Sequence, residues 1–138
     1  MENTSDLRHG RHCVFVIHVH LVFVAKYRKQ VFTKQVLDDL KKIFKDVCTD
    51  FEAELVEFDG EGDHVHLLVN YPPKVAVSKL VNSLKGVSSR LIRKQNYPSI
   101  STALWGNSLW SPSYFAASCG GAPIAIIRQY IEQQQTPK

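Results

Sequence analysis

The segment DHVHLLVN, residues 63–70, carries an apolar side chain at every second position. Because successive side chains of a β-strand point to opposite sides, this spacing predicts a strand with one face toward a hydrophobic core. The core-facing side chains are those of Val65, Leu67 and Val69, and the opposite face carries His64, His66 and Asn70. The prolines of the next segment, YPPK at residues 71–74, end the strand.

Three further strands are predicted on either side of this one. Residues 13–25 are rich in Val, Phe and Ile and lack Gly and Pro, which is typical of a strand. The side of this strand that does not face the core carries a second pair of histidines, His18 and His20. The remaining predicted strands are residues 53–58 and residues 113–118.

Apolar residues at helical spacing predict two amphipathic helices and a third, shorter one. The first helix begins after the N-cap residue Thr33 and carries apolar side chains as far as Phe51. The second covers residues 77–91, and its other faces are basic. The third has the sequence PIAIIRQYIEQQQ and begins at Pro123, directly after the segment that contains Gly120 and Gly121.

The predicted order is therefore β-α-β-β-α-β-α within one domain, residues 1–138. The first six elements match the ferredoxin-like plan, an α+β fold with an antiparallel sheet and both helices on one face. The last helix then carries Tyr130, and both histidine pairs should lie on the open face of the sheet. Residues 1–11 are expected to be loose, and residues 96–112 to form a loop whose Trp105 and Trp110 pack against the core.

The composition fits a globular chain without a membrane-spanning segment. Hydrophobic residues make up 44% of the sequence, but no apolar run is long enough to cross a bilayer. The three cysteines Cys13, Cys48 and Cys119 are far apart and show no zinc-binding spacing, which favours a reducing cytoplasm over a disulfide framework. A net charge of +4 is compatible with a nucleic-acid partner.

Two groups of side chains could carry chemistry. His64 and His66 project from the same face of a strand and could share a metal ion, with Asp63 orienting one ring. They could also be no more than hydrogen-bonded neighbours. Tyr130 and Gln134 share a helical face, so that Gln134 could give its amide oxygen to a hard cation while Tyr130 acts as a nucleophile. The alternative for Tyr130 is packing against its apolar neighbours on the helix.

In combination these residues resemble a known family. DHVH at residues 63–66 resembles the HUH motif, two histidines around a hydrophobic residue, and QYIEQQ at residues 129–134 resembles the single-tyrosine motif Tyr-Ile-Glu-x-Gln. Both motifs, in this order, are similar to those of the single-tyrosine HUH transposases, of TnpA type, carried by small bacterial insertion sequences. The segments HLVFVAKYRKQVF, LKGVSSRLI and LWSPSYF extend the resemblance over nearly the whole chain.

The resemblance implies a cytoplasmic homodimer, bacterial or archaeal, that cuts and rejoins single-stranded DNA at element ends and recognises DNA hairpins there. It implies that Tyr130 attacks a phosphodiester and forms a 5′-phosphotyrosine. His64, His66 and Gln134 would hold Mg²⁺ or Mn²⁺. The joint at residues 120–121 would let Tyr130 serve its own subunit or the other one, and the sequence leaves both arrangements open.

A further set of side chains is expected to support this centre or to contact DNA. The set consists of Asp63, His20, Lys26, Arg28, Lys85 and Arg90. His20 stands where the family has a histidine, whereas His18 has no such counterpart. Gly62 replaces the family's usual proline before Asp63, so a looser approach to the strand is expected.

Three other functions fit parts of the sequence. A chromosomal HUH nuclease acting on repeated palindromes would use the same chemistry in a different role. A non-catalytic RNA- or DNA-binding module could use the same sheet, but it predicts aromatic side chains where this chain has histidines. A metal-dependent hydrolase would need more carboxylates near the histidines than Asp63.

Overall fold

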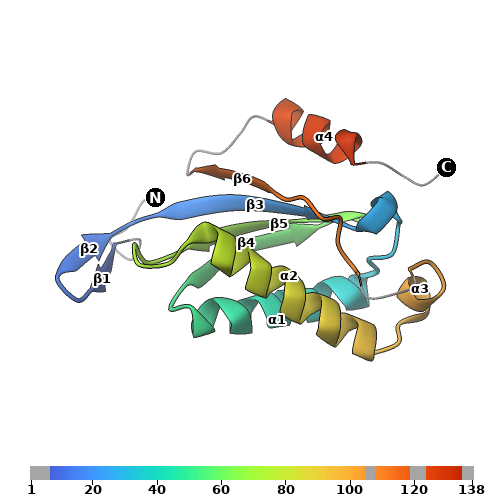
Figure 1. Cartoon of the computed structure of the whole chain (residues 1–138), viewed down its shortest axis with the longest axis horizontal. Coiled ribbons are helices and arrows are strands. Elements are labelled where there is room, and N and C mark those ends of the chain that lie inside the picture. The colour runs from blue at the N-terminus through green and yellow to red at the C-terminus, as the bar shows by residue number, and fades with distance from the viewer. Residues whose placement is uncertain (1–6, 105–107, 119–123, 135–138) are drawn as a thin grey trace.

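The computed structural model of the protein describes residues 7–104, 108–118 and 124–134. A four-stranded antiparallel sheet in the order β4-β5-β3-β6 lies at its centre (Figure 1). The strands are β3 (His18–Val24), β4 (Glu54–Gly60), β5 (His64–Asn70) and β6 (Phe115–Ser118). The first and third strands of the β-α-β-β-α-β unit are thus central, which confirms the ferredoxin-like plan.

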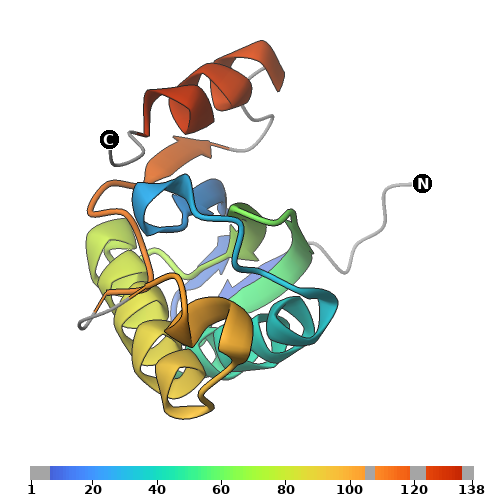
Figure 2. The ribbon, with the colours of Figure 1, turned by 90° about the vertical axis from the view of Figure 1, so that its right-hand side faces the viewer.

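Two helices, α1 (Lys34–Asp50) and α2 (Val77–Lys94), cover one face of this sheet (Figures 1 and 2). Thr33 caps α1 as expected, because its hydroxyl accepts a hydrogen bond from the Val36 N–H at 3.3 Å. Both helices bury apolar residues at helical spacing against the sheet. The central strands contribute Val19, Leu21, Phe23, Val65, Leu67 and Val69 to this core.

An aromatic cluster joins the two layers. The ring of Phe44 on α1 lies 5.9 Å from Phe23, 5.8 Å from Phe58 and 6.2 Å from Trp110. The indole N–H of Trp110 donates to the hydroxyl of Ser88 on α2 at 2.9 Å, so its one polar group is satisfied inside the core. Trp110 therefore packs its loop against the core as predicted, while Trp105 lies outside the described residues.

A β-bulge in β4 decides which of its side chains face the core. Leu55 pairs with Val69, but Glu57 rather than Val56 pairs with Leu68, so Val56 is an extra residue in the strand. The alternation of side chains is inverted after this point. As a result Phe58 packs in the core, and Asp59 comes beside His66 on the other face.

The structure differs from the prediction in four segments. Residues 8–10 are not loose but form β1 (Arg8–Gly10), which pairs with β2 (Cys13–Phe15) in a separate two-stranded ribbon. The predicted strand over 13–25 is therefore two strands, β2 and β3. The predicted loop over 96–112 contains a short helix, α3 (Pro98–Ser101), and the basic turn after β3 is a 3-10 helix, Lys26–Arg28.

The last helix, α4 (Ile124–Gln133), lies on the face of the sheet opposite to α1 and α2 (Figures 1 and 2). It is held by a small apolar cluster of Val22, Val24 and Ile131, with Phe115 and Tyr130 packed against it. Gly120 and Gly121 lie outside the described residues. Within the described ranges, no helix combines the length and hydropathy needed to cross a bilayer.

Candidate active site

His64 is held at the start of β5 by its neighbour Asp63. The Nδ1 atom of His64 donates to Oδ1 of Asp63 at 2.7 Å, and Oδ2 of Asp63 forms an ion pair with Nε of Arg28 at 3.6 Å. Asp63 is 5% exposed, and its backbone carbonyl accepts the Ala25 N–H at 2.8 Å. The carboxylate therefore fixes the orientation of the His64 ring and ties it to the turn after β3.

The approach to Asp63 is not loose, contrary to the expectation from Gly62. The carbonyl of Gly62 accepts the N–H groups of Val31 and Phe32, each at 2.9 Å. A Cβ atom at position 62 would overlap the end of the Gln30 side chain. Glycine at this position thus gives Gln30 room beside the strand, and two hydrogen bonds hold the backbone.

His66 is paired with His20 on the neighbouring strand. His20 Nε2 and His66 Nδ1 share a hydrogen bond at 3.3 Å, and the rings of His64 and His66 lie 5.0 Å apart. Burial, and then the proximity of His64 and His20, lower the pKa of His66 to about 4. Burial also lowers the pKa of His20, against an opposing influence of Glu57. Both rings are therefore neutral at neutral pH and carry a nitrogen lone pair.

A cleft of about 420 Å³, here called the histidine cleft, lies beside the pair. Its walls come from the turn after β3, the start of β5 and one side of α4. The lining residues are Arg28, Gln30, Glu61, Gly62, Asp63, His64, His66, Arg128, Ile131 and Glu132. A second groove of about 680 Å³ crosses the open face and shares His66, with His20, Glu57 and Asp59 also in its wall.

Tyr130 and Gln134 do not line the histidine cleft of their own chain. The ring of Tyr130 packs against Phe115 at 5.7 Å, and its hydroxyl is buried. Burial raises the pKa of Tyr130, while the nearby Ser113 side chain acts in the opposite direction. The amide oxygen of Gln134 accepts from the Ser111 hydroxyl at 2.6 Å. The chain thus brings His64, His66 and Asp63 together in one cleft, and the described contacts of Tyr130 and Gln134 are with Phe115 and Ser111 beside it.

The residues present fit part of a metal site. His64 and His66 offer imidazole nitrogens suited to a divalent ion. Among the described residues, no cluster of three or more His, Cys, Asp or Glu side chains could complete such a site. A third ligand of another type, or one from elsewhere, is therefore needed, and an amide oxygen such as that of Gln134 meets this chemical requirement.

The basic residues expected to contact DNA have different surroundings. Arg28 lines the histidine cleft, and Lys26 lies 5.3 Å from the centre of the exposed Tyr27 ring. Lys85 instead donates to the backbone carbonyls of Ser111 and Ser113 at 2.7 and 3.0 Å, and burial lowers its pKa to about 8. Arg90 is exposed on α2, in the layer away from the histidines. The described hydrogen bonds of Lys85 therefore join α2 to the segment before β6.

Several site residues were not predicted from the sequence. Ser111 and Ser113 contact Gln134 and Tyr130, and Arg128 and Glu132 line the cleft. The polar serines around Pro112 in WSPSY were the available signal for the first two. Asp59 reaches His66 only because of the bulge in β4, which the sequence pattern does not reveal.

Known proteins resemble this chain along most of its length. Residues 13–134 match the family described as "Transposase IS200 like". The ISDra2 transposase TnpA of Deinococcus radiodurans is 36% identical over 129 residues, which is 94% of this chain and 91% of the relative. The transposase for insertion sequence element IS200 of Salmonella typhimurium is 29% identical over 135 residues, 97% of this chain and 85% of the relative.

Solved structures show the same fold. The crystal structure of a protein from Deinococcus radiodurans R1, described as a transposase, matches with a TM-score of 0.81 and 35% identity, over 94% of this chain and 99% of the other. A REP-associated tyrosine transposase bound to a REP hairpin matches with a TM-score of 0.52 and 14% identity, over 84% of this chain and 62% of the other, which shows a shared fold. From the family match and the relative that is 36% identical over 94% of this chain, the chain belongs to the IS200-like transposases.

Proposed function

We propose that this transposase cleaves and rejoins single-stranded DNA through a covalent bond between Tyr130 and a 5′-phosphate. The observation that carries the proposal is the anchoring of two neighbouring imidazoles. Nδ1 of His64 is bound by Asp63, and Nδ1 of His66 is bound by His20. When each Nδ1 is the donor, each Nε2 keeps a free lone pair for a metal ion.

In this proposal His64, His66 and Gln134 hold Mg²⁺ or Mn²⁺. When bound, such an ion neutralises and orients the phosphate that is attacked. The ligand set of two imidazoles and one amide has no charge of its own. Within the described ranges Asp63 is the one carboxylate that forms a hydrogen bond with His64, and it serves to orient that ring. This arrangement favours transesterification at a phosphate over a hydrolase with several carboxylate ligands.

Tyr130 acts as the nucleophile. Its phenol loses a proton, the phenolate oxygen bonds to phosphorus, and the bond from phosphorus to the 3′ oxygen breaks, so that the 3′ oxygen leaves with a proton as a hydroxyl. Rejoining reverses these steps with a 3′-hydroxyl as the attacking group. Because the phosphate ester bond is retained in the intermediate, rejoining requires no ATP.

The position of Tyr130 supports a homodimer in which α4 of one subunit serves the cleft of the other. In its own chain Tyr130 packs on Phe115 and Gln134 binds Ser111, outside the histidine cleft. In the proposed homodimer a second chain supplies these two side chains to the cleft, and a movement of α4 within one chain is the alternative. Gly120 and Gly121, between β6 and α4 in the sequence, permit backbone conformations that other residues disfavour.

The direct test is a covalent adduct on single-stranded DNA. The probe is a hairpin-containing strand from the DNA that flanks the coding sequence, with Mg²⁺ or Mn²⁺. A protein–DNA adduct at Tyr130 that requires the ion, and that Tyr130→Phe loses while it still binds the strand, is expected. Cleavage by Tyr130→Phe at the rate of the unmodified protein would contradict the proposal.

Complementation between two inactive variants tests the arrangement of subunits. Tyr130→Phe keeps the histidines, and His64→Ala keeps the tyrosine. If α4 serves the other subunit, mixed dimers contain one complete site, and mixing the two variants restores cleavage. If each subunit uses its own tyrosine, or if the protein is a monomer, the mixture stays inactive.

The nature of the DNA decides between two biological roles. The REP-associated relative was solved with a REP hairpin, so action on repeated palindromes would use the same fold. The relatives that match over 91% and 85% of their length are transposases of insertion sequences, which favours the ends of an element as the substrate. Cleavage of element ends in preference to isolated chromosomal palindromes is expected.

A further inference from the structure

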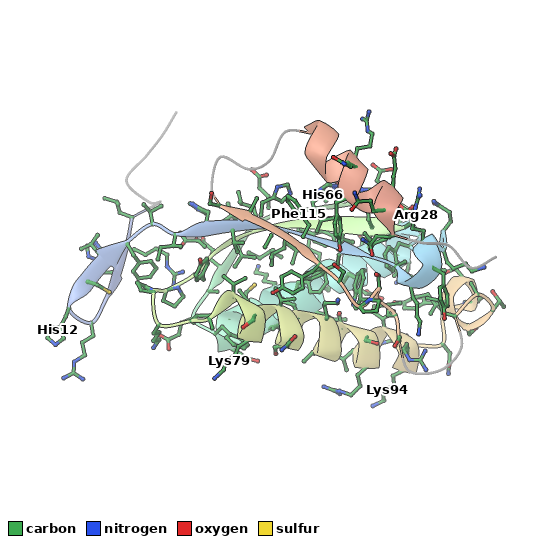
Figure 3. The ribbon with its side chains drawn as sticks, turned by 45° about the horizontal axis from the view of Figure 1, so that its top comes forward. His12, Arg28, His66, Lys79, Lys94 and Phe115 are labelled. Carbon is green, nitrogen blue, oxygen red and sulfur yellow. The ribbon has the colours of Figure 1, made fainter. Side chains whose placement is uncertain are left out.

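We infer that Arg28 binds a phosphate of the DNA strand in the histidine cleft, beside the site of His64 and His66. The inference rests on the proposed function, since it takes single-stranded DNA as the ligand. Arg28 lines the same cleft as both histidines. In Figure 3, Arg28 and His66 lie on the α4 side of the sheet, while Lys79 and Lys94 on α2 lie on the other side.

The guanidinium of Arg28 forms an ion pair with Asp63 and keeps donors for a further partner. Its side chain is 32% exposed, and its Nε atom is buried 3.6 Å from Asp63 without a hydrogen bond. In the described ranges its two terminal nitrogens have no hydrogen-bond or ion-pair partner. These nitrogens can donate to two oxygens of one phosphate, which is the geometry that guanidinium groups favour.

The backbone that carries Arg28 has an unfavourable conformation. Tyr27 and Arg28 both have positive φ angles, 61° and 54°, although neither is glycine. Hydrogen bonds from the Lys26 N–H to the Leu109 carbonyl at 2.9 Å and from the Arg28 N–H to the Ala25 carbonyl at 2.8 Å hold this turn. Two consecutive residues of this kind cost free energy, and such conformations concentrate at sites of function.

Asp63 links the arginine to the histidines. One oxygen of its carboxylate accepts from His64, and the other faces Arg28. A single buried side chain therefore sets both groups in one wall of the cleft. The other acidic residues of the cleft, Glu61 and Glu132, are exposed to water, which screens their charge. A phosphate that enters the cleft thus meets a guanidinium with free donors beside the two imidazoles.

A methylphosphonate scan tests this contact without any cleavage. The protein carries Tyr130→Phe, and the probe is the hairpin-containing strand from the flanking DNA, with one uncharged methylphosphonate linkage moved along it. At one linkage, loss of the charge should weaken binding about tenfold, because bonds to charged groups have this strength. Adding Arg28→Ala should weaken binding of the unmodified strand by a similar factor and have no further effect on that one modified strand.

Two controls separate a phosphate contact from a structural role. Lys94→Ala removes one positive charge on α2, outside the cleft, and should leave the scan unchanged. Arg28→Lys keeps the charge without the paired donors, so its loss of DNA affinity should lie between those of the unmodified protein and Arg28→Ala. In Arg28→Ala the affinity for Mn²⁺ alone should fall less than the affinity for DNA, because the hydrogen bond from His64 to Asp63 remains.

The inference is overturned if Arg28→Ala weakens all the modified strands equally, or if it leaves binding of the unmodified strand intact. It is also overturned if Arg28→Ala lowers Mn²⁺ affinity as much as DNA affinity, since Arg28 would then act only through Asp63. A failure of the proposed function is a different result, namely the absence of a Tyr130 adduct. The scan, carried out with Tyr130→Phe, does not depend on that adduct.

Discussion

The two faces of the sheet differ in what they contribute. The face under α1 and α2 is sealed by apolar and aromatic side chains around Phe44. The other face carries three histidines joined by hydrogen bonds to each other or to Asp63, and its helix α4 rests on a cluster of only three buried residues, Val22, Val24 and Ile131, among those described. The face under α1 and α2 provides the stability of the fold. Because the sheet is stabilised there, the face under α4 can hold polar groups in a fixed geometry.

The largest expected effect is the loss of DNA cleavage when a histidine of the open face is removed. His64→Ala should lower DNA cleavage by about a thousandfold, since even residues that only orient a metal ligand contribute about 10–100-fold. Its effect on stability should be small, because His64 lines the histidine cleft and does not belong to the apolar core. Cleavage kinetics and urea unfolding measure the two quantities.

His18→Ala is the matched control, with the same change in the other histidine pair. It should keep both activity and stability, because His18 does not line the histidine cleft. If His18→Ala were inactive and His64→Ala active, the wrong histidine pair would have been assigned to the chemistry.

Substitutions in the core should instead lower the stability of the fold. Phe44 is fully buried and contacts three aromatic rings, so Phe44→Ala should lower the free energy of unfolding by about 3–5 kcal/mol. Phe44→Leu should cost less, since it leaves a smaller cavity. Urea unfolding at neutral pH measures both. A loss below about 1 kcal/mol for Phe44→Ala would show that the cluster is not the stabilising centre.

His20 should have a smaller effect, on metal binding. If its hydrogen bond to His66 sets the tautomer of that ring, His20→Ala should weaken Mn²⁺ binding by about tenfold. Titration calorimetry without DNA measures this directly. His20→Gln, which can also accept a hydrogen bond, should recover part of the affinity. Unchanged Mn²⁺ binding in His20→Ala would show that His20 does not set the tautomer of His66.

Lys85 is a charged residue of α2 whose side chain is partly buried, and the smallest expected effect is its contribution to the pH dependence of stability. Its folded pKa of about 8 lies below its ordinary value of 10.5, so between these pH values the unfolded chain binds a proton that the folded chain has lost. The free energy of unfolding should therefore rise with pH through this window, by about 1 kcal/mol after allowance for solvent screening. Lys85→Met should lack this rise when the two proteins are compared at pH 7.5 and 10.5.

Local patterns were sufficient to predict most of the fold. The alternation in residues 63–70 and the helical spacing after Thr33 predicted the strands and helices that contact the core, because burial imposes those periods. The ribbon of β1 and β2 was missed because residues 8–10 have no apolar alternation. The ribbon depends on contacts distant in sequence, such as the hydrogen bonds from Arg8 to the carbonyls of Asn70 and Glu52.

The site was predictable only in part. The sequence placed His64, His66 and Asp63 together because they are neighbours on one strand. It could not show that His20 would bind His66, since that contact depends on the register between β3 and β5. It also could not show on which side of α4 the cleft would lie. The helix presents Arg128 and Glu132 to its own cleft, and Tyr130 and Gln134 elsewhere.

The bulge at Val56 makes one position of β4 tolerant of a change in length. Loss of this single codon would remove the extra residue and leave Leu55 opposite Val69 and Phe58 opposite Leu67. The benzyl group would stay among the aromatic rings and the carboxylate of Asp59 beside His66. In a mutational survey of this gene, deletion of codon 56 should therefore be tolerated better than deletion of codon 58, and many substitutions of the half-exposed valine should persist.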